Sequence, residues 1–263
     1  MARIATTFER LRQAKQVGLV TYVTAGDPTL ARTAEILVAL EANGADLLEV
    51  GVPFSDPLAD GPVIQRASER ALASGTTLRG TLAMIRGVRS KIAAPIVLFT
   101  YANPILRMGE AAFVQAAADA GVDGVLMLDL PVEEAGPFQA QLVEAGIDPI
   151  FLLSPTTTDA RVEASAAMGR GFLYVISRLG VTGARTDLAT NAESLVTRIR
   201  SHSSLPLALG FGISSPAHVA EVGRWADAAV VGSALVSVIA EHSAAADLPE
   251  RAGAYVRWLK GQA

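Results

Sequence analysis

The chain has 263 residues, of which 51% are hydrophobic and 18% are charged, and its formal net charge is −4. This composition is typical of a globular protein with a large core and excludes a disordered chain. The acidic balance, with no stripe of basic residues, argues against a protein that binds nucleic acid or an anionic membrane.

The sequence contains no cysteine. Disulfides, thiolate nucleophiles and cysteine-based metal sites are therefore excluded, and this composition fits a reducing compartment. The N-terminal segment 1–18 lacks the apolar stretch of a signal peptide, and no apolar run approaches the ~20 residues of a membrane helix. We therefore expect a cytoplasmic protein without a membrane segment.

Short apolar runs recur along the chain, with helical patterns between them and an extra helix expected before the first run. Most runs are continuous and not alternating, as expected of strands that are buried on both faces. In chain order the predicted strands are Leu19–Thr24, Leu47–Gly51, Ile96–Thr100, Gly124–Leu128, Pro149–Leu153, Phe172–Ile176, Leu207–Gly210 and Ala228–Gly232.

A short motif repeats where a helix gives way to the next strand. It reads Gly44–Asp46, Gly121–Asp123 and Gly146–Asp148, and Trp225–Asp227 has the same place. Eight such strand–helix units in one chain of about 250 residues have the size of a closed (β/α)8 barrel. We predict an α/β fold, a single TIM-barrel domain over residues 1–263. An open doubly wound sheet is the alternative, but no GxGxxG follows the first strand.

The second predicted strand carries a carboxylate, Glu49, in the run LLEVG. Period two puts Leu47, Glu49 and Gly51 on one face of this strand. If that face points into the barrel near its upper layer, desolvation raises the pKa of Glu49 into a range useful for proton transfer. The alternative is a structural glutamate paired with an arginine. Asp60, in the loop that follows, offers a second carboxylate, although an aspartate before a glycine is also common in turns.

Barrels place their active sites at the C-terminal ends of the strands. Glycine-bearing turns follow the last three strands: GVTG at Gly180–Gly183, GFGIS at Gly210–Ser214 and VGSA at Val231–Ala234. Bare amides and helix N-termini bind anions without lysine, so the three turns together predict a phosphate site. Each turn alone is explained equally well as a tight turn.

Apolar and aromatic residues near the mouth predict a flat hydrophobic part of the substrate, although each of them alone is more often a core residue. They are Tyr22, Phe99, Tyr101, Leu126, Tyr174 and Phe211. With the phosphate site, this apolar slot indicates a ligand of the aryl sugar-phosphate type.

Residue types that are missing from the strand ends narrow the chemistry. A Schiff-base aldolase needs a lysine there, but the lysines fall in helical or terminal segments. These lysines are Lys15, Lys91 and Lys260. The histidines are expected on helices or loops away from the rim: His202, His218 and His242. No histidine pair or acidic group has metal-ligand spacing, so no metal is expected. Acid–base chemistry by carboxylates and hydroxyls remains.

Several motifs resemble the alpha subunit of tryptophan synthase over nearly the whole chain. They are YVTAGDP (Tyr22–Pro28), LLEVGVPFSDPLADGPVIQ (Leu47–Gln65), YANP (Tyr101–Pro104), DLPVEE (Asp129–Glu134), SRLGVTGAR (Ser177–Arg185), GFGIS and VVGSALV. The resemblance implies a lyase of tryptophan biosynthesis, which cleaves indole-3-glycerol phosphate to indole and glyceraldehyde 3-phosphate. This retro-aldol reaction needs neither a Schiff base nor a metal.

The resemblance also implies roles for particular residues. Glu49 matches the general acid–base that protonates indole C3, and Asp60 matches the carboxylate that binds the indole N–H. Thr182 would hold Asp60 once the loop carrying Thr182 closes, and Tyr174 would contact the substrate near Glu49. The positions that match the family's phosphate site are Gly183, Gly212, Gly232 and Ser233.

The family works with a beta subunit that carries pyridoxal phosphate, in an αββα heterotetramer that passes indole internally. The resemblance therefore implies no cofactor in this chain. The segments Pro53–Asp60, Tyr101–Pro104 and Pro131–Glu134 would face the partner. Three alternatives stay open: a free-standing lyase that releases indole, another phosphate-binding barrel enzyme, and a non-catalytic subunit. The missing strand-end histidines and lysines disfavour the second, and the intact Glu49 and Asp60 disfavour the third.

Overall fold

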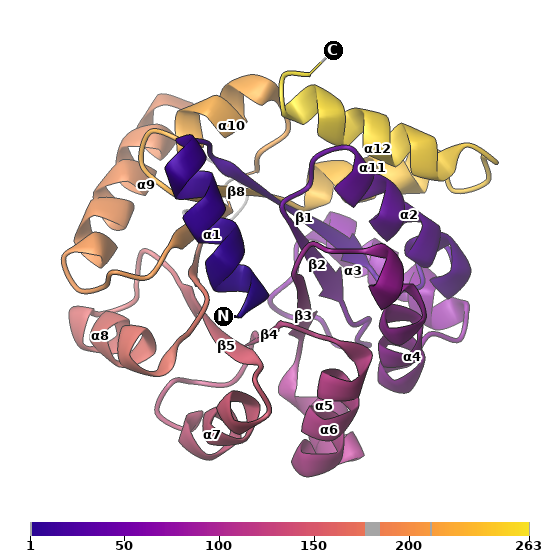
Figure 1. Ribbon diagram of the computed structural model, residues 1–263, viewed down its shortest axis with the longest axis horizontal. Coiled ribbons are helices and arrows are strands. Elements are labelled where there is room, and N and C mark those ends of the chain that lie inside the picture. Colours follow the sequence, from indigo (N-terminus) through magenta and orange to yellow (C-terminus); the bar gives the residue numbers. More distant parts are fainter. Residues whose placement is uncertain (1, 177–184, 211, 263) are drawn as a thin grey trace.

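The computed structural model describes residues 2–176, 185–210 and 212–262, with the backbone alone for 185–191. Within these ranges eight parallel strands close into a barrel in chain order, and β1 pairs with β8 to complete it. Helices surround the strands (Figure 1). The predicted (β/α)8 barrel and its extra N-terminal helix are thereby confirmed.

The strands lie close to where the apolar runs predicted them. β2, β3 and β7 have the predicted bounds, and each of the other strands differs by one residue at one end, which is the usual uncertainty of a strand boundary. The strands are β1 Gly18–Thr24, β2 Leu47–Gly51, β3 Ile96–Thr100, β4 Gly124–Met127, β5 Asp148–Leu153, β6 Leu173–Ile176, β7 Leu207–Gly210 and β8 Ala228–Val231.

Several helices begin at a hydroxyl residue whose side chain accepts a backbone N–H of the first turn. Thr29, Thr77, Thr158 and Ser215 act in this way and each satisfies one otherwise unpaired amide. The helices are α1 Arg3–Ala14, α2 Leu30–Ala42, α3 Pro62–Ala73, α4 Leu78–Val88, η1 Arg89–Lys91, α5 Ala102–Met108, α6 Glu110–Ala120, α7 Gly136–Glu144, α8 Asp159–Met168, α9 Arg185–Arg200, α10 Pro216–Val222, α11 Ser233–Glu241 and α12 Leu248–Leu259.

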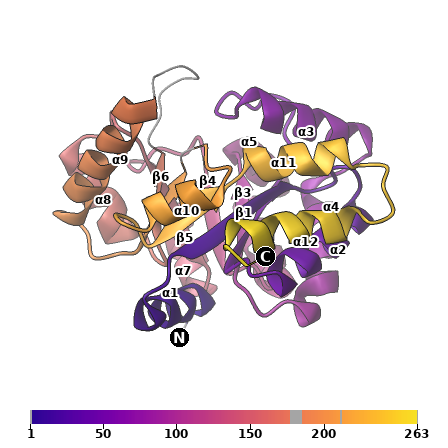
Figure 2. The same ribbon diagram turned by 90° about the horizontal axis from the view of Figure 1, so that it is seen from above.

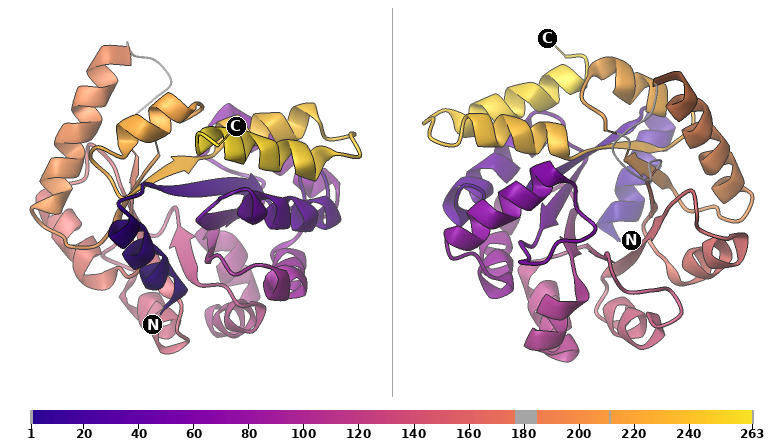
Figure 3. Two further views of the ribbon diagram at one scale, coloured as in Figure 1. Left: turned by 45° about the horizontal axis from the view of Figure 1, so that its top comes forward. Right: turned by 180° about the vertical axis from the view of Figure 1, so that it is seen from behind.

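The extra helix α1 closes the end of the barrel at which the strands begin. Its apolar face, Ile4, Phe8 and Leu11, is buried against the inward-facing residues of the strands. Phe8 packs on Phe172 with ring centroids 5.7 Å apart. Figures 1 and 2 show α1 across this end, and the right panel of Figure 3 shows the opposite opening. The chemistry is therefore expected at that opposite opening.

The aspartate of the repeated junction motif fastens neighbouring strands together at the closed end. Asp46 accepts the backbone N–H of Leu19 at 3.0 Å, and Asp123 accepts that of Ile96 at 2.9 Å. Asp227 accepts the N–H of Leu207 at 2.8 Å. Each carboxylate thus bonds to the start of the preceding strand in the chain, so the repeat has a structural role.

Basic side chains neutralise these junction carboxylates. Asp46 pairs with Arg10 of α1 at 2.7 Å and with Lys260, near the C-terminus, at 2.6 Å. Asp123 pairs with Arg3 of α1 at 2.7 Å and with Arg89 at 3.2 Å. Both ends of the chain are therefore tied to the base of the barrel by ion pairs.

No helix within the described ranges is long and apolar enough to cross a membrane.

Candidate active site

Glu49 lies in the middle of β2 and is fully buried, with an exposed fraction of 0%. Neither of its carboxylate oxygens has a hydrogen-bond partner among the residues that the structure describes. Burial raises the pKa of Glu49 to about 8, because the charged form loses its hydration without a compensating partner. A paired structural carboxylate would show a cation or several donors beside it. Within the described ranges the pairing with arginine is therefore wrong, and a group that exchanges protons near neutral pH is the better description.

Asp60 lies on the loop that joins β2 to α3, and the side chain of Tyr101 holds it there. The Tyr101 hydroxyl donates to Asp60 Oδ2 at 3.0 Å, and itself accepts the N–H of Ala59 at 3.1 Å. Gln65 of α3 donates to the Asp60 carbonyl at 3.0 Å. Burial raises the pKa of Asp60 to about 6, against the lowering effect of the Tyr101 hydrogen bond. Asp60 is thus held in place, which a simple turn role would not require.

Three aromatic side chains form one wall beside these carboxylates. Tyr22 of β1 pairs in register with Glu49 of β2 and is 4% exposed. Its ring meets that of Phe99 edge to face, with centroids 5.2 Å apart, and Phe99 lies 6.3 Å from Tyr174 of β6. Burial raises the pKa of Tyr174, and among charged groups Glu49 has the largest effect on it. The structure thus gathers Tyr22, Phe99 and Tyr174 on one wall of the site.

The remaining predicted slot residues lie at different depths. Leu126 of β4 is fully buried in the same inner cluster as Tyr174 and Phe99. Tyr101 stacks on Phe54 of the preceding loop, with centroids 5.0 Å apart. Phe211, Thr182 and Gly183 lie outside the described residues.

Two of the predicted phosphate turns, after β7 and after β8, lie at least partly within the described residues. Gly232 precedes α11, and no side chain caps that helix N-terminus. Ser233, the first residue of α11, is exposed. Gly212 has φ +58°, a left-handed conformation that favours glycine, and an added Cβ there would meet no atom within 4 Å. These groups can receive an anion, because unpaired N–H groups and the helix dipole both favour negative charge.

Sequence reasoning missed the side chains that hold the turn after β7. The N–H of Ser214 donates to His218 Nδ1 at 3.3 Å, and the Tyr255 hydroxyl donates to the Ser214 carbonyl at 3.1 Å. The expectation that all three histidines lie away from the rim is therefore wrong for His218, because α10 begins immediately after this turn. The sequence does contain a signal for the position of His218. Ser215-Pro216 marks the start of a helix, and this places His218 one turn from Ser214.

A bound metal would need a cluster of ligating side chains, and a Schiff base would need a lysine. No group of three or more histidine, cysteine, aspartate or glutamate residues with metal-binding geometry occurs within the described ranges. The lysines lie at the end of α1, in η1 and after α12, as predicted.

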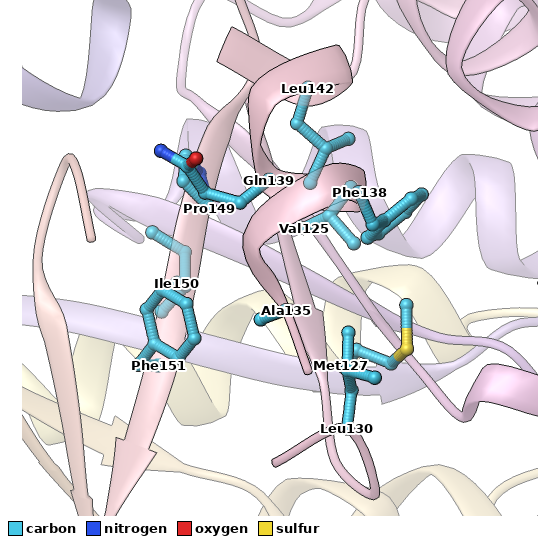
Figure 4. Close-up of a pocket in the computed structure, with 10 residues that line it drawn as sticks. All are labelled: Val125, Met127, Leu130, Ala135, Phe138, Gln139, Leu142, Pro149, Ile150 and Phe151. Carbon is cyan, nitrogen blue, oxygen red and sulfur yellow. The ribbon is translucent and has the colours of Figure 1, made fainter. Parts of the chain in front are cut away.

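An apolar cavity outside the barrel is separate from this site. It lies between β4, β5 and α7 and is lined by Val125 of β4, Phe151 of β5, and Phe138 and Leu142 of α7, among others (Figure 4). Its volume of about 20 Å³ is close to what a single water molecule occupies. It is therefore a packing defect and not a site for an organic ligand.

Known proteins similar to this chain share one description. A family described as tryptophan synthase alpha chain matches residues 8–258. The tryptophan synthase alpha chain of Geotalea uraniireducens (strain Rf4) is 50% identical over 260 residues, covering 99% of this chain and 97% of the relative. That of Methylococcus capsulatus (strain ATCC 33009 / NCIMB 11132 / Bath) is 52% identical over 254 residues, covering 96% and 94%.

Solved structures give the same result. Tryptophan synthase subunit alpha from Legionella pneumophila str. Paris superposes with a TM-score of 0.92 at 37% identity, covering 100% of this chain and 98% of that one. A chain of tryptophan synthase from M. tuberculosis, in the open form with BRD0059 bound, has a TM-score of 0.89 at 34% identity, covering 100% and 98%.

Proposed function

The chain belongs to the tryptophan synthase alpha chain family, and from this premise we propose which of its residues carry out the family's reaction. That reaction is the lyase cleavage of indole-3-glycerol phosphate to indole and glyceraldehyde 3-phosphate. The observation that carries the assignment is the buried carboxylate of Glu49, which has no hydrogen-bond partner among the described residues and lies inside the barrel whose open end carries Asp60.

Glu49 acts as the general acid and then as the general base. With a pKa raised to about 8 it is largely protonated at neutral pH and can give a proton to C3 of the indole ring. The C3–H bond forms, and the bond from C3 to the first glycerol carbon becomes able to break. Glu49, now a carboxylate, accepts the proton of the hydroxyl on that carbon as its carbonyl forms. The electron pair of the broken bond returns to the ring, so protons and electrons balance.

Asp60 acts as the anionic partner of the ring nitrogen. Protonation at C3 places positive charge on the ring, and an ionised carboxylate beside the N–H lowers the energy of that cation. The pKa of Asp60, about 6, leaves it largely ionised at pH 7. Burial thus separates the two carboxyl groups into one acid and one anion, which is the division of roles that this chemistry requires.

The rest of the site binds the two ends of the substrate. We assign the aromatic part to the slot residues and the phosphate to the three glycine-bearing turns, supported by the aromatic wall and by the uncapped start of α11. Thr182 is assigned to holding Asp60 once the loop that carries Thr182 closes. The slot residues are Tyr22, Phe99, Tyr101, Leu126, Tyr174 and Phe211, and the phosphate residues are Gly183, Gly212, Gly232 and Ser233.

The proposal extends to the assembly. One domain over residues 1–263 works in the cytoplasm with a beta subunit in an αββα complex, and pyridoxal phosphate resides only in that partner. Leu58 supports this, because it is 85% exposed in the segment expected to face the partner. The chain itself needs no cofactor for the steps above.

The test is the release of indole from indole-3-glycerol phosphate by the purified chain, with and without a cognate beta subunit. Slow cleavage alone with a large increase on adding the partner is the expected result. Fast cleavage alone would identify a free-standing lyase, and no cleavage in either case would overturn the assignment.

A further inference from the structure

The hydroxyl of Tyr22 is held in one place at the centre of the site. A Cβ added to Gly51 would lie 2.1 Å from Tyr22 Oη, so the phenol occupies the space that a side chain at position 51 would need. The edge-to-face contact with Phe99 fixes the ring plane. The Thr24 hydroxyl donates to Tyr22 Oη at 3.4 Å. Gly51 lies on the same face of β2 as Glu49, and the Tyr22 hydroxyl fills the space beside it.

This hydroxyl still has a proton to donate. A phenol offers one donor, and the bond with Thr24 uses its acceptor side. Within the described ranges Tyr22 donates no side-chain hydrogen bond, although it is almost fully buried. A buried hydroxyl that donates no hydrogen bond lowers the stability of the folded protein. Any acceptor that moves within reach of the Tyr22 hydroxyl is therefore bound favourably.

Tyr22 packs in one cluster with Val63 and Ile64 of α3, the residues three and four positions beyond Asp60, so its ring lies against the end of the loop that carries this carboxylate. Burial and then the Asp60 charge raise the pKa of Tyr22, with a smaller contribution from Glu49. For Tyr174 the order is reversed, and Glu49 comes before Asp60. Tyr101, at the end of β3, is the other titratable group against Asp60 and bonds to its Oδ2.

Asp60 gains from a further donor, besides the Thr182 assigned above, when substrate fills the site. The filled site excludes water, and this favours the neutral carboxylic acid over the carboxylate that a cationic ring requires. The Tyr101 hydroxyl alone opposes that effect in the described structure. A second hydrogen bond to an ionised oxygen is among the stronger ones available in a protein.

We infer that Tyr22 is a positioning residue for Asp60: in the substrate-bound site its hydroxyl donates to the Asp60 carboxylate, keeping that group ionised and turned toward the ring N–H. The inference rests on the role proposed above for Asp60. Tyr22 then acts from β1 and Tyr101 from β3, so the loop carboxylate is held between two strands of the barrel.

Tyr22→Phe tests this directly, because it removes one oxygen and keeps the ring. The kcat for indole release, measured across pH with the cognate beta subunit present, is expected to fall about 10-fold to 100-fold at neutral pH. The acid limb of the kcat profile, which reports the substrate complex, is expected to move upward by about one pH unit. The acid limb of kcat/KM, which reports the free enzyme, is expected to move less. KM changes little if the ring packing survives.

Two further variants make the result decisive. Tyr174→Phe removes a phenol of the same kind that faces Glu49, and it is expected to leave the acid limb where it is. Asp60→Asn is expected to lose turnover, and an active Asp60→Asn variant would overturn the proposed role of Asp60 itself. If Asp60→Asn is inactive while Tyr22→Phe keeps the native acid limb and kcat, only the inference on Tyr22 is overturned. Thermal unfolding of Tyr22→Phe checks that packing is intact.

Discussion

Arg70 of α3 holds the Asp27 carboxylate with two hydrogen bonds, of 2.8 and 2.7 Å. Asp27 is 2% exposed and lies in the turn after β1, whereas the Arg70 side chain is 38% exposed. The α3 helix begins at Pro62, two residues beyond Asp60. The ion pair therefore anchors the element that fixes the downstream end of the loop carrying Asp60.

Replacing Arg70 with methionine is expected to destabilise the protein. Methionine keeps much of the packing but leaves the Asp27 carboxylate buried without its cation. Removing one charge of a buried pair destabilises a protein more than removing both charges. We expect a loss of about 2 kcal/mol, below the range for fully buried pairs because Arg70 is partly in water. Urea unfolding measures it, and the double variant Asp27→Asn, Arg70→Met should recover part of the loss. Equal stabilities of the native chain and Arg70→Met would contradict this.

Gly51→Ala is expected to damage both stability and turnover. Its methyl group would lie 2.1 Å from the oxygen of Tyr22 and 2.5 Å from Cζ, so the whole ring must move. Overpacking of this kind costs about 1–3 kcal/mol. Gly136→Ala is the matched control, because a Cβ there meets nothing within 4 Å. Thermal unfolding and indole release are the measurements, and a native-like Gly51→Ala would show that the ring has room to shift.

Glu49→Gln is expected to abolish indole release while leaving the fold intact. With a pKa of about 8 the native side chain is mostly neutral at pH 7, and glutamine is a neutral group of the same size. Loss of the proton donor should cost at least about 100-fold in kcat. Stability and the affinity for inorganic phosphate should stay close to native. Loss of both folding and phosphate binding would instead indicate a structural role. Glu144→Gln, on the surface of α7, serves as the matched control.

The pH dependence of kcat/KM follows from the two raised pKa values. Asp60 must be ionised, so activity is expected to fall below about pH 6. Glu49 must be protonated, so activity is expected to fall above about pH 8. Turnover should therefore be highest between these limits. A profile that stays flat from acid to neutral pH would contradict the role assigned to Asp60. A profile that stays flat well above pH 8 would contradict the role assigned to Glu49.

Asp148→Asn is expected to stabilise the protein at neutral pH. Unlike the other junction aspartates, Asp148 has one oxygen without a partner among the described residues, and burial raises its pKa to about 6. The folded chain therefore binds this proton more tightly than the unfolded chain. The resulting stabilisation is complete at low pH and is lost as pH rises through about 6.

The expected gain for Asp148→Asn at pH 7 is about 1 kcal/mol, since partial hydration screens the charge. Urea unfolding at pH 5 and pH 7 measures it, and the gain should be smaller at pH 5. Asp123→Asn, which removes a paired carboxylate, should destabilise the protein. A gain at both pH values alike would point to packing instead of charge.

The barrel could be predicted from sequence because its strands are continuous apolar runs separated by helical periods. Glu49 was identifiable because it interrupts one of these runs at a position where period two directs the side chain inward. Asp60 was only a candidate, because nothing in the loop sequence reveals the hydrogen bond from Tyr101, which comes from another strand. Contacts between separate strands depend on strand register and on closure of the barrel, and neither can be read from a single sequence.

The junction aspartates show the same limit. Their repetition was visible, but their bonds to the preceding strand and to Arg3, Arg10 and Lys260 were not. The difference between Asp148 and its counterparts was equally invisible, because it depends on which cations the fold brings near. His218 was misplaced although it follows the predicted GFGIS turn by only four residues; what the sequence does not show is the bond from the Ser214 N–H to its ring.

The closed end of the barrel, with α1 and the junction ion pairs, has a consequence for how this enzyme can change. The ion pairs of Arg3, Arg10 and Lys260 lie at that end, and the carboxylates Glu49 and Asp60, proposed to carry out the reaction, lie at the other. Substitutions at the base can therefore accumulate, in nature or by design, with little effect on turnover. A lineage that moves to a hotter habitat can adjust Arg3, Arg10, Asp148 or Lys260 and pass its catalytic machinery on unaltered.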